Sequence, residues 1–110
     1  MSDIDAGVEL YVKALDDLGI THTDPVRSDV GASGAKARFD ITVDGYDAGI
    51  NIFPDAAALT TWGKLSDSFG GIYVAKGTAV LTLNSSEGIS DSATVAPKIA
   101  GAVGGEAHGV

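Results

Sequence analysis

The sequence of 110 residues contains no cysteine, only two histidines, and seven basic residues against fifteen acidic ones. Without cysteine there is no disulfide framework, no thiolate nucleophile and no cysteine ligand for zinc or an iron–sulfur cluster. The two histidines, His22 and His108, are far apart in the chain and leave little for a histidine-rich metal site. We therefore expect no cofactor and no bound metal.

The excess of acidic residues gives a net charge of −8. Nucleic-acid phosphates and anionic membrane surfaces are both bound by clustered lysine and arginine, so this balance argues against direct phosphate binding and against a membrane partner. Behind Met1 there is no basic stretch followed by an apolar core, and no window approaches the roughly 18 apolar residues of a membrane span. These features predict a cytoplasmic protein.

The length fits a single domain covering residues 1–110. Residues 2–18 are predicted to form an amphipathic helix, because apolar side chains recur at helical spacing. They are Ile4, Val8, Tyr11, Val12, Leu15 and Leu18. Residues 19–35 contain glycine, proline, serine and aspartate without any period, which predicts a long loop, either mobile or functional.

Residues 36–70 are predicted to form a hairpin followed by a helix. Asp44-Gly45 is a strong signal for a tight turn, and a two-residue turn would pair Val43 with Tyr46 and place the apolar residues of both strands on one face. Pro54 suits the start of a helix. Its predicted buried stripe is Ala58, Leu59, Trp62, Leu65 and Phe69, and a glycine pair follows.

Residues 71–105 are predicted to form a second unit of the same kind. Its turn falls at Lys76-Gly77 or Gly77-Thr78, and its helix covers residues 90–103 with Ser90 as N-cap. Because Pro97 lies inside this helix, either the helix is kinked there or its regular part starts near Thr94. The tail after Gly105 is expected to fray.

The two units share a sequence pattern that indicates an internal repeat. Trp62, Leu65 and Phe69 match Ala96, Ile99 and Val103 at an offset of 34, and the apolar strand positions match at an offset of 33. One hairpin-plus-helix unit leaves a sheet face uncovered, whereas two joined edge to edge share a core. We therefore predict an α+β fold of order α-β-β-α-β-β-α, with a four-stranded antiparallel sheet and all helices on one face.

This order of elements resembles that of the pterin carbinolamine dehydratases. The run from Tyr73 to Ala100, which includes Glu87-Gly88-Ile89-Ser90-Asp91 before the last helix, is similar to the second half of that fold. The family's activity depends on a histidine-rich segment after the middle helix. Here that place holds Ser68-Phe69-Gly70-Gly71, so the resemblance implies the topology and not the catalytic residues.

The stretch from Phe53 to Gly105 also resembles small uncharacterised proteins of actinobacteria and their phages. The shared residues are Trp62, Leu65, Phe69-Gly70-Gly71, Ala96-Pro97-Lys98-Ile99-Ala100 and Gly104-Gly105. This resemblance implies no known activity, but it adds a virion-associated location to the cytoplasmic one, should a phage genome encode the chain.

With all helices on one side, the opposite face of the sheet would be exposed. Four largely apolar residues fall on it and form the candidate interface: Phe53, Tyr73, Ala75 and Val80. A continuous exposed apolar patch indicates a contact surface.

No residue spacing points to a positioned general acid or base, so we expect no enzyme. The sequence predicts a small non-enzymatic interaction module that binds another protein or itself, as a self-associating structural or accessory component of a phage or actinobacterial assembly. The alternative is an acidic inhibitor that occupies a basic site on a host enzyme, or a small-ligand-binding protein.

Overall fold

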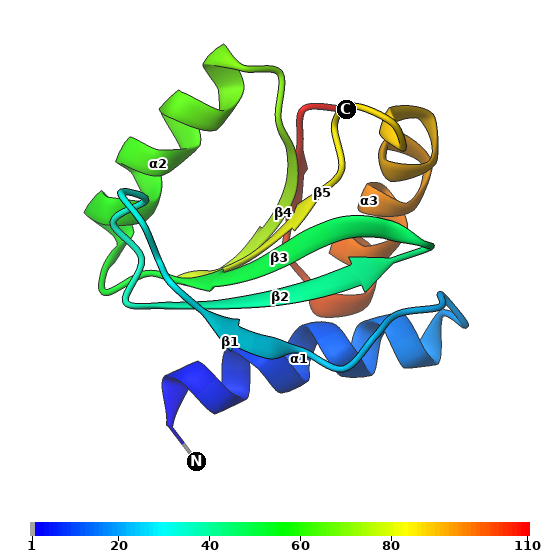
Figure 1. Cartoon of the computed structure of the whole chain (residues 1–110), viewed down its shortest axis with the longest axis horizontal. Helices are drawn as coiled ribbons and strands as arrows, with labels where there is room; N and C mark the ends of the chain where they lie inside the picture. The colour runs from blue at the N-terminus through cyan, green and yellow to red at the C-terminus, as the bar shows by residue number, and fades with distance from the viewer. Residues whose placement is uncertain (1) are drawn as a thin grey trace.

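The computed structural model describes residues 2–110 and has an α+β fold with three helices and one six-stranded antiparallel sheet. The helices are α1 (Asp3–Asp17), α2 (Ala56–Ser68) and α3 (Ile89–Val103). The strands are β1 (Val26–Ser28), β2 (Ala37–Val43), β3 (Tyr46–Ile52), β4 (Ile72–Lys76), β5 (Ala79–Leu83) and β6 (Glu106–His108). The strand order is β1-β2-β3-β5-β4-β6, so two hairpins join through β3 and β5 (Figure 1).

The four strands predicted from the sequence are present, but the sheet has six, so the prediction of a four-stranded sheet is wrong. β1 lies within the segment 19–35 that was predicted as a loop, and it pairs with β2. β6 lies in the tail that was expected to fray, and it pairs with β4. Both strands have three residues, too few to show an alternating pattern, and each depends on a free strand edge for its backbone hydrogen bonds.

The register predicted for the first hairpin is confirmed. Val43 pairs with Tyr46 and Ala37 pairs with Ile52 at its far end. Asp44 and Gly45 both have positive φ, 55° and 85°, as a type I′ turn requires. In the second hairpin Lys76 pairs with Ala79, which places Gly77 and Thr78 in the turn.

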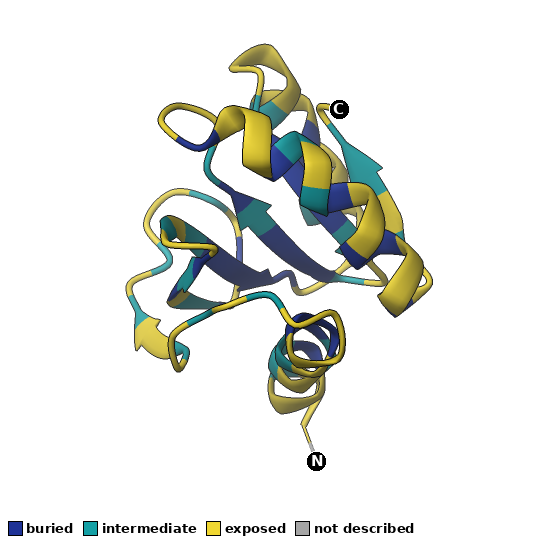
Figure 2. Cartoon of the chain, turned by 90° about the vertical axis from the view of Figure 1, so that its right-hand side faces the viewer, coloured by how far each residue is buried: buried dark blue, intermediate teal, exposed yellow. Residues whose placement is uncertain are grey.

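The main core lies between one face of the sheet and helices α1 and α3. Both helices turn their buried residues toward the strands (Figure 2). Buried positions on α1 include Tyr11 and Leu15, and those on α3 include Ala96 and Ile99. The hydroxyl of Tyr11 donates to the carbonyl oxygen of Ala79 at 2.7 Å and lies 3.1 Å from that of Val74, so α1 is fastened to the backbone of the second hairpin.

Helix α2 lies against the opposite face of the sheet, so the prediction that all helices share one face is wrong (Figure 1). Successive strand residues point to opposite faces, and Phe53 follows the last residue of β3, Ile52, which belongs to the main core. Phe53 therefore begins a second, smaller core on the other face, together with half-buried residues of α2 that include Leu59 and Trp62. No helix within residues 2–110 is long and apolar enough to cross a membrane.

Helix α2 buries much less of itself than the sequence predicts. Gly63 is its only fully buried residue. Two residues of the predicted stripe, Leu65 and Phe69, are 54% and 78% exposed. The helix is therefore held to the sheet through its middle, from Ala58 to Gly63, and the residues after Gly63 bury little.

Candidate functional site

The four residues predicted to form an exposed interface are not exposed together. Phe53, Tyr73 and Val80 are 0%, 3% and 0% exposed, because α2 covers them. Ala75 is half-buried at the edge of α2. The expected exposure of this sheet face is therefore wrong, and its apolar residues form a second core instead.

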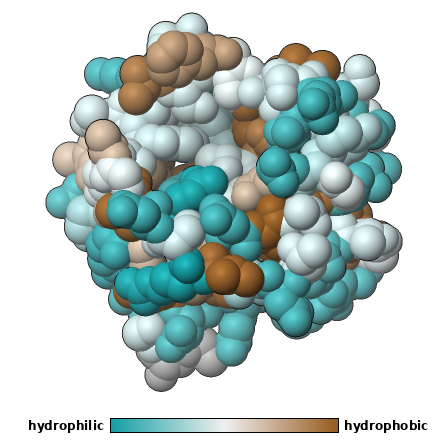
Figure 3. All heavy atoms as spheres, viewed as in Figure 1, coloured by the Kyte–Doolittle hydropathy of each residue, from teal (hydrophilic) through white to brown (hydrophobic). Residues whose placement is uncertain are grey.

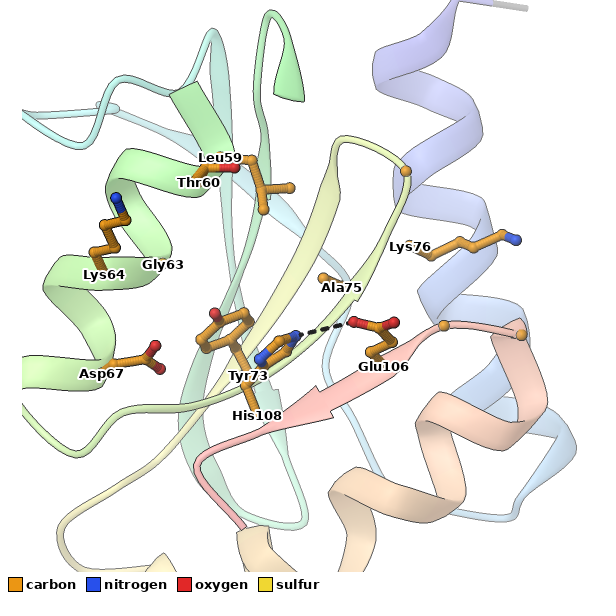
Figure 4. Close-up of a pocket in the computed structure, with 13 residues that line it drawn as sticks. Leu59, Thr60, Gly63, Lys64, Asp67, Tyr73, Ala75, Lys76, Glu106 and His108 are labelled. Carbon is orange, nitrogen blue, oxygen red and sulfur yellow. Dashed lines mark ion pairs between the residues drawn. The ribbon is translucent and has the colours of Figure 1, made fainter. Parts of the chain in front are cut away.

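An open cleft of about 520 Å³ lies beside this second core, between α2 and the strands β4 and β6 at one end of the sheet (Figure 4). We call it the α2–β6 cleft. Its lining comes from α2 (Leu59, Thr60, Gly63, Lys64 and Asp67), from the β4 hairpin (Tyr73, Ala75, Lys76 and Gly77) and from the C-terminal segment (Gly104, Gly105, Glu106 and His108). Its volume falls within the range of small-molecule sites, roughly 300–1,000 Å³.

Tyr73 forms the floor of the cleft. The imidazole of His108 stacks on its ring with the centroids 4.5 Å apart and the planes 8° from parallel. On the other side Trp62 meets the Tyr73 ring edge-on at 4.8 Å, and Phe53 packs against Trp62 at 5.5 Å. Tyr73 and His108 are direct partners in the β4–β6 pairing, so the sheet itself holds the two rings together.

Two carboxylates flank these stacked rings. Asp67 points toward them from α2, and Glu106 approaches from β6 with its Oε2 3.6 Å from Nε2 of His108 (Figure 4). Burial raises the pKa of Tyr73 first, and the negative charges of Asp67 and Glu106 raise it further. The negative charges of both acids therefore make the electrostatic potential at the centre of the cleft more negative.

The two lysines of the lining extend away from the stacked rings (Figure 4). A β-carbon placed on Gly104 would lie 3.9 Å from Nζ of Lys76, so this ammonium lies beside the C-terminal cap of α3. The last turn of α3 has no basic residue of its own, and a cation there is favoured by the helix dipole. The centre of the cleft is therefore aromatic and acidic.

Little in the sequence pointed to this site. His108 and Glu106 lie in a tail that was expected to fray, and Asp67 has no partner spacing that would single it out. Of the predicted interface, the structure brings Tyr73 and Ala75 into the cleft lining and leaves Phe53 and Val80 beneath α2. Only the pairing of β6 with β4 brings the acidic and aromatic groups together.

A second hollow of about 510 Å³ lies over β1 and β2. Its one base, Arg38, contacts Oδ1 of Asp40 and Oδ1 of Asn51 at 3.3 Å each, so its charge is already partnered. The guanidinium also lies over Gly49, where a β-carbon would clash with it. This hollow has no aromatic floor, and we do not assign it a ligand.

Elsewhere, residues 2–110 contain few other candidate sites. Among residues 2–110 no group of three or more histidine, cysteine, aspartate or glutamate side chains could hold a metal ion. On the face seen in Figure 3, apolar residues lie in separate patches with polar residues between them. Comparisons with protein-family models, curated proteins and solved structures give no match. The resemblances inferred from the sequence stay predictions.

Proposed function

We propose that this protein is a small non-enzymatic interaction module and that the α2–β6 cleft is where it binds a segment of another protein. The observation that carries the proposal is the cleft itself, an open hollow of about 520 Å³ with a rigid aromatic floor. Stacked aromatic side chains contribute a large contact area with little loss of conformational entropy, which suits them to recognition.

The position of the cleft supports a binding role. Its floor belongs to the sheet, whereas its wall is α2, of which only Gly63 is buried. A rigid floor with a less tightly packed wall allows the site to adapt to an extended segment. Self-association through the interface predicted from the sequence is not part of this proposal, because α2 covers three of its four residues, Phe53, Tyr73 and Val80.

Two neighbouring threonines of α2 give a matched test. The hydroxyls of Thr60 and Thr61 each donate to the carbonyl four residues earlier, and both side chains are exposed, but only Thr60 lines the cleft. Thr60→Trp should obstruct the cleft, and Thr61→Trp should add the same bulk outside it. Neither change touches a buried contact, so both variants should fold.

The experiment is a selection of binders from a displayed library of random peptides, using the wild-type protein as bait. The selected peptides should lose at least about tenfold in affinity for Thr60→Trp and should bind Thr61→Trp like the wild type. Peptides that bind all three proteins equally, or a library that yields no specific binder, would contradict the proposal.

A further inference from the structure

The chemistry of the α2–β6 cleft indicates which group of a partner it receives. At its centre the rings of Tyr73 and His108 lie between the carboxylates of Asp67 and Glu106 (Figure 4). An aromatic surface with carboxylates beside it is the usual environment of a bound cation, which interacts with the ring face and forms charge-assisted hydrogen bonds with the acids.

We propose that the α2–β6 cleft binds an arginine side chain of a partner protein, stacked on the imidazole of His108 and bonded to Glu106, with the charge of Asp67 adding attraction from the other side of the stacked rings. This inference rests on the proposed function and deepens it. One face of the His108 ring is covered by Tyr73, so the 35% of the side chain that is exposed lies on its other face and edges. That face opens on the cleft, of which His108 is a lining residue.

Arginine fits this arrangement better than lysine does. A guanidinium is planar, so it stacks on a ring, and its fork of donors can bond both oxygens of one carboxylate. Lysine offers a single, strongly hydrated charge. The net charge of −8 would also attract a basic segment over a distance of several ångströms and speed its association.

The lysines of the lining do not block a cation. Lys76 lies beside the C-terminal cap of α3, and Lys64 extends along α2 away from the rings (Figure 4). Glu106 is 82% exposed and contacts only His108 among the ion pairs of residues 2–110, so its second oxygen is free to accept from a ligand.

The test uses two small probes, acetyl-arginine amide and acetyl-citrulline amide, which have nearly the same shape but differ in charge. Each is titrated into the full chain at pH 8 and low salt while the ring resonances of Tyr73 and His108 are followed by NMR. The arginine probe should produce saturable shifts at both rings, and the citrulline probe should not.

Four variants locate the site. Glu106→Gln should weaken binding of the arginine probe about two- to fivefold, since an exposed ion pair contributes up to about 1 kcal/mol. Asp67→Asn should weaken it less, because it removes only the longer-range attraction, and the double variant should show the largest loss. Glu9→Gln makes the same change of charge on α1, where Glu9 is exposed, and should leave binding unchanged. Equal binding of both probes, or unchanged binding in the double variant, would overturn the inference.

These outcomes are separate from those of the peptide selection. If Thr60→Trp removes the selected peptides but the arginine probe does not bind, the interaction module stands and its assignment to arginine is wrong. If the probe binds at the two rings but no peptide depends on the cleft, the site is a receptor for small cations and the proposed protein-binding role is wrong.

Discussion

Helices α2 and α3 follow equivalent hairpins, yet they pack on opposite faces of the sheet and at different depths. On α3 the buried face includes two small residues, Ala96 and Ala100, and the helix lies close enough to the strands that Ile99 is fully buried. On α2 the contact is made through Leu59 and Trp62, both half-buried, and the cleft opens beside Gly63. Large contact residues keep a helix away from its sheet, and the space left between them becomes available to a ligand.

The strongest test of this contrast replaces a large apolar residue on each helix. Ile99→Ala should lower the free energy of unfolding by about 2–5 kcal/mol, because it opens a cavity in the main core. Leu65→Ala should change it by no more than about 0.5 kcal/mol, because that side chain is 54% exposed. Urea unfolding monitored by circular dichroism measures both. Similar losses in the two variants would mean that α2 is packed as tightly as α3.

Alanine substitutions at two glycines measure how closely the regions of α3 and α2 approach their neighbours. A β-carbon on Gly105, which follows α3, would clash with the backbone carbonyl of Ala75, so Gly105→Ala should cost about 2 kcal/mol. A β-carbon on Gly63 of α2 would lie 2.8 Å from the hydroxyl of Tyr73. There the gain of about 1 kcal/mol in helix propensity offsets the crowding, and the net change should stay within about 1 kcal/mol.

The same urea measurement decides this comparison. A larger loss for Gly63→Ala than for Gly105→Ala would show that α2 cannot shift relative to Tyr73. The wall of the cleft would then be rigid, and the proposed adaptation to an extended segment would have no structural basis.

The sequence predicted those parts of the fold that depend on local pattern. The register of β2 and β3 followed from the alternation of apolar residues and from the turn residues Asp44 and Gly45, and the pairing confirms it. The main core was predicted for similar reasons, since the helical spacing of α1 marks Tyr11 and Leu15 as inward-facing.

The side of the sheet on which a helix packs was not predictable from its apolar stripe. Trp62 and Leu65 of α2 match Ala96 and Ile99 of α3 in the sequence, but only the α3 residues are fully buried. A stripe shows that a helix has a buried side and does not show which face of the sheet it covers. The choice depends on Phe53, whose place after β3 directs it to the face opposite the main core.

The candidate site was the least predictable part for a related reason. Its aromatic and acidic groups come from α2, β4 and β6, and β6 is a three-residue strand whose pairing depends on the free edge of β4. No local pattern in residues 106–108 predicts the pairing of β6 with β4.

Removing the hydroxyl of a buried tyrosine on each face of the sheet tests the same contrast between the two helices. Tyr11, on the α3 side, donates to the carbonyl of Ala79, so Tyr11→Phe should cost about 1 kcal/mol and leave buried carbonyl oxygens without this donor. Tyr73, on the α2 side, lines the cleft, and Tyr73→Phe should cost less than about 0.5 kcal/mol. Thermal unfolding of the two variants checks this order. A reversed order would place the tighter polar contact on the α2 side.

The smallest expected effect is a pH dependence of stability at the C-terminal end of α1, the helix that packs on the same face of the sheet as α3. The carbonyl of Thr23, 2.8 Å from Nδ1 of His22, and then the carboxylate of Asp16, 2.6 Å from Nε2, raise the pKa of His22. A raised pKa in the folded state gives stability that is fully present below the unfolded pKa of about 6.5, and it is lost as the pH rises through the folded value.

Asp16→Asn should therefore remove up to about 1 kcal/mol at pH 5.5 relative to the change it causes at pH 8.5. Taking the difference between the two pH values cancels any gain from removing a negative charge at the C-terminal end of α1, which does not depend on pH in this range. Urea midpoints at the two pH values measure this difference. An effect of the same size at both would show that Asp16 does not stabilise a protonated His22.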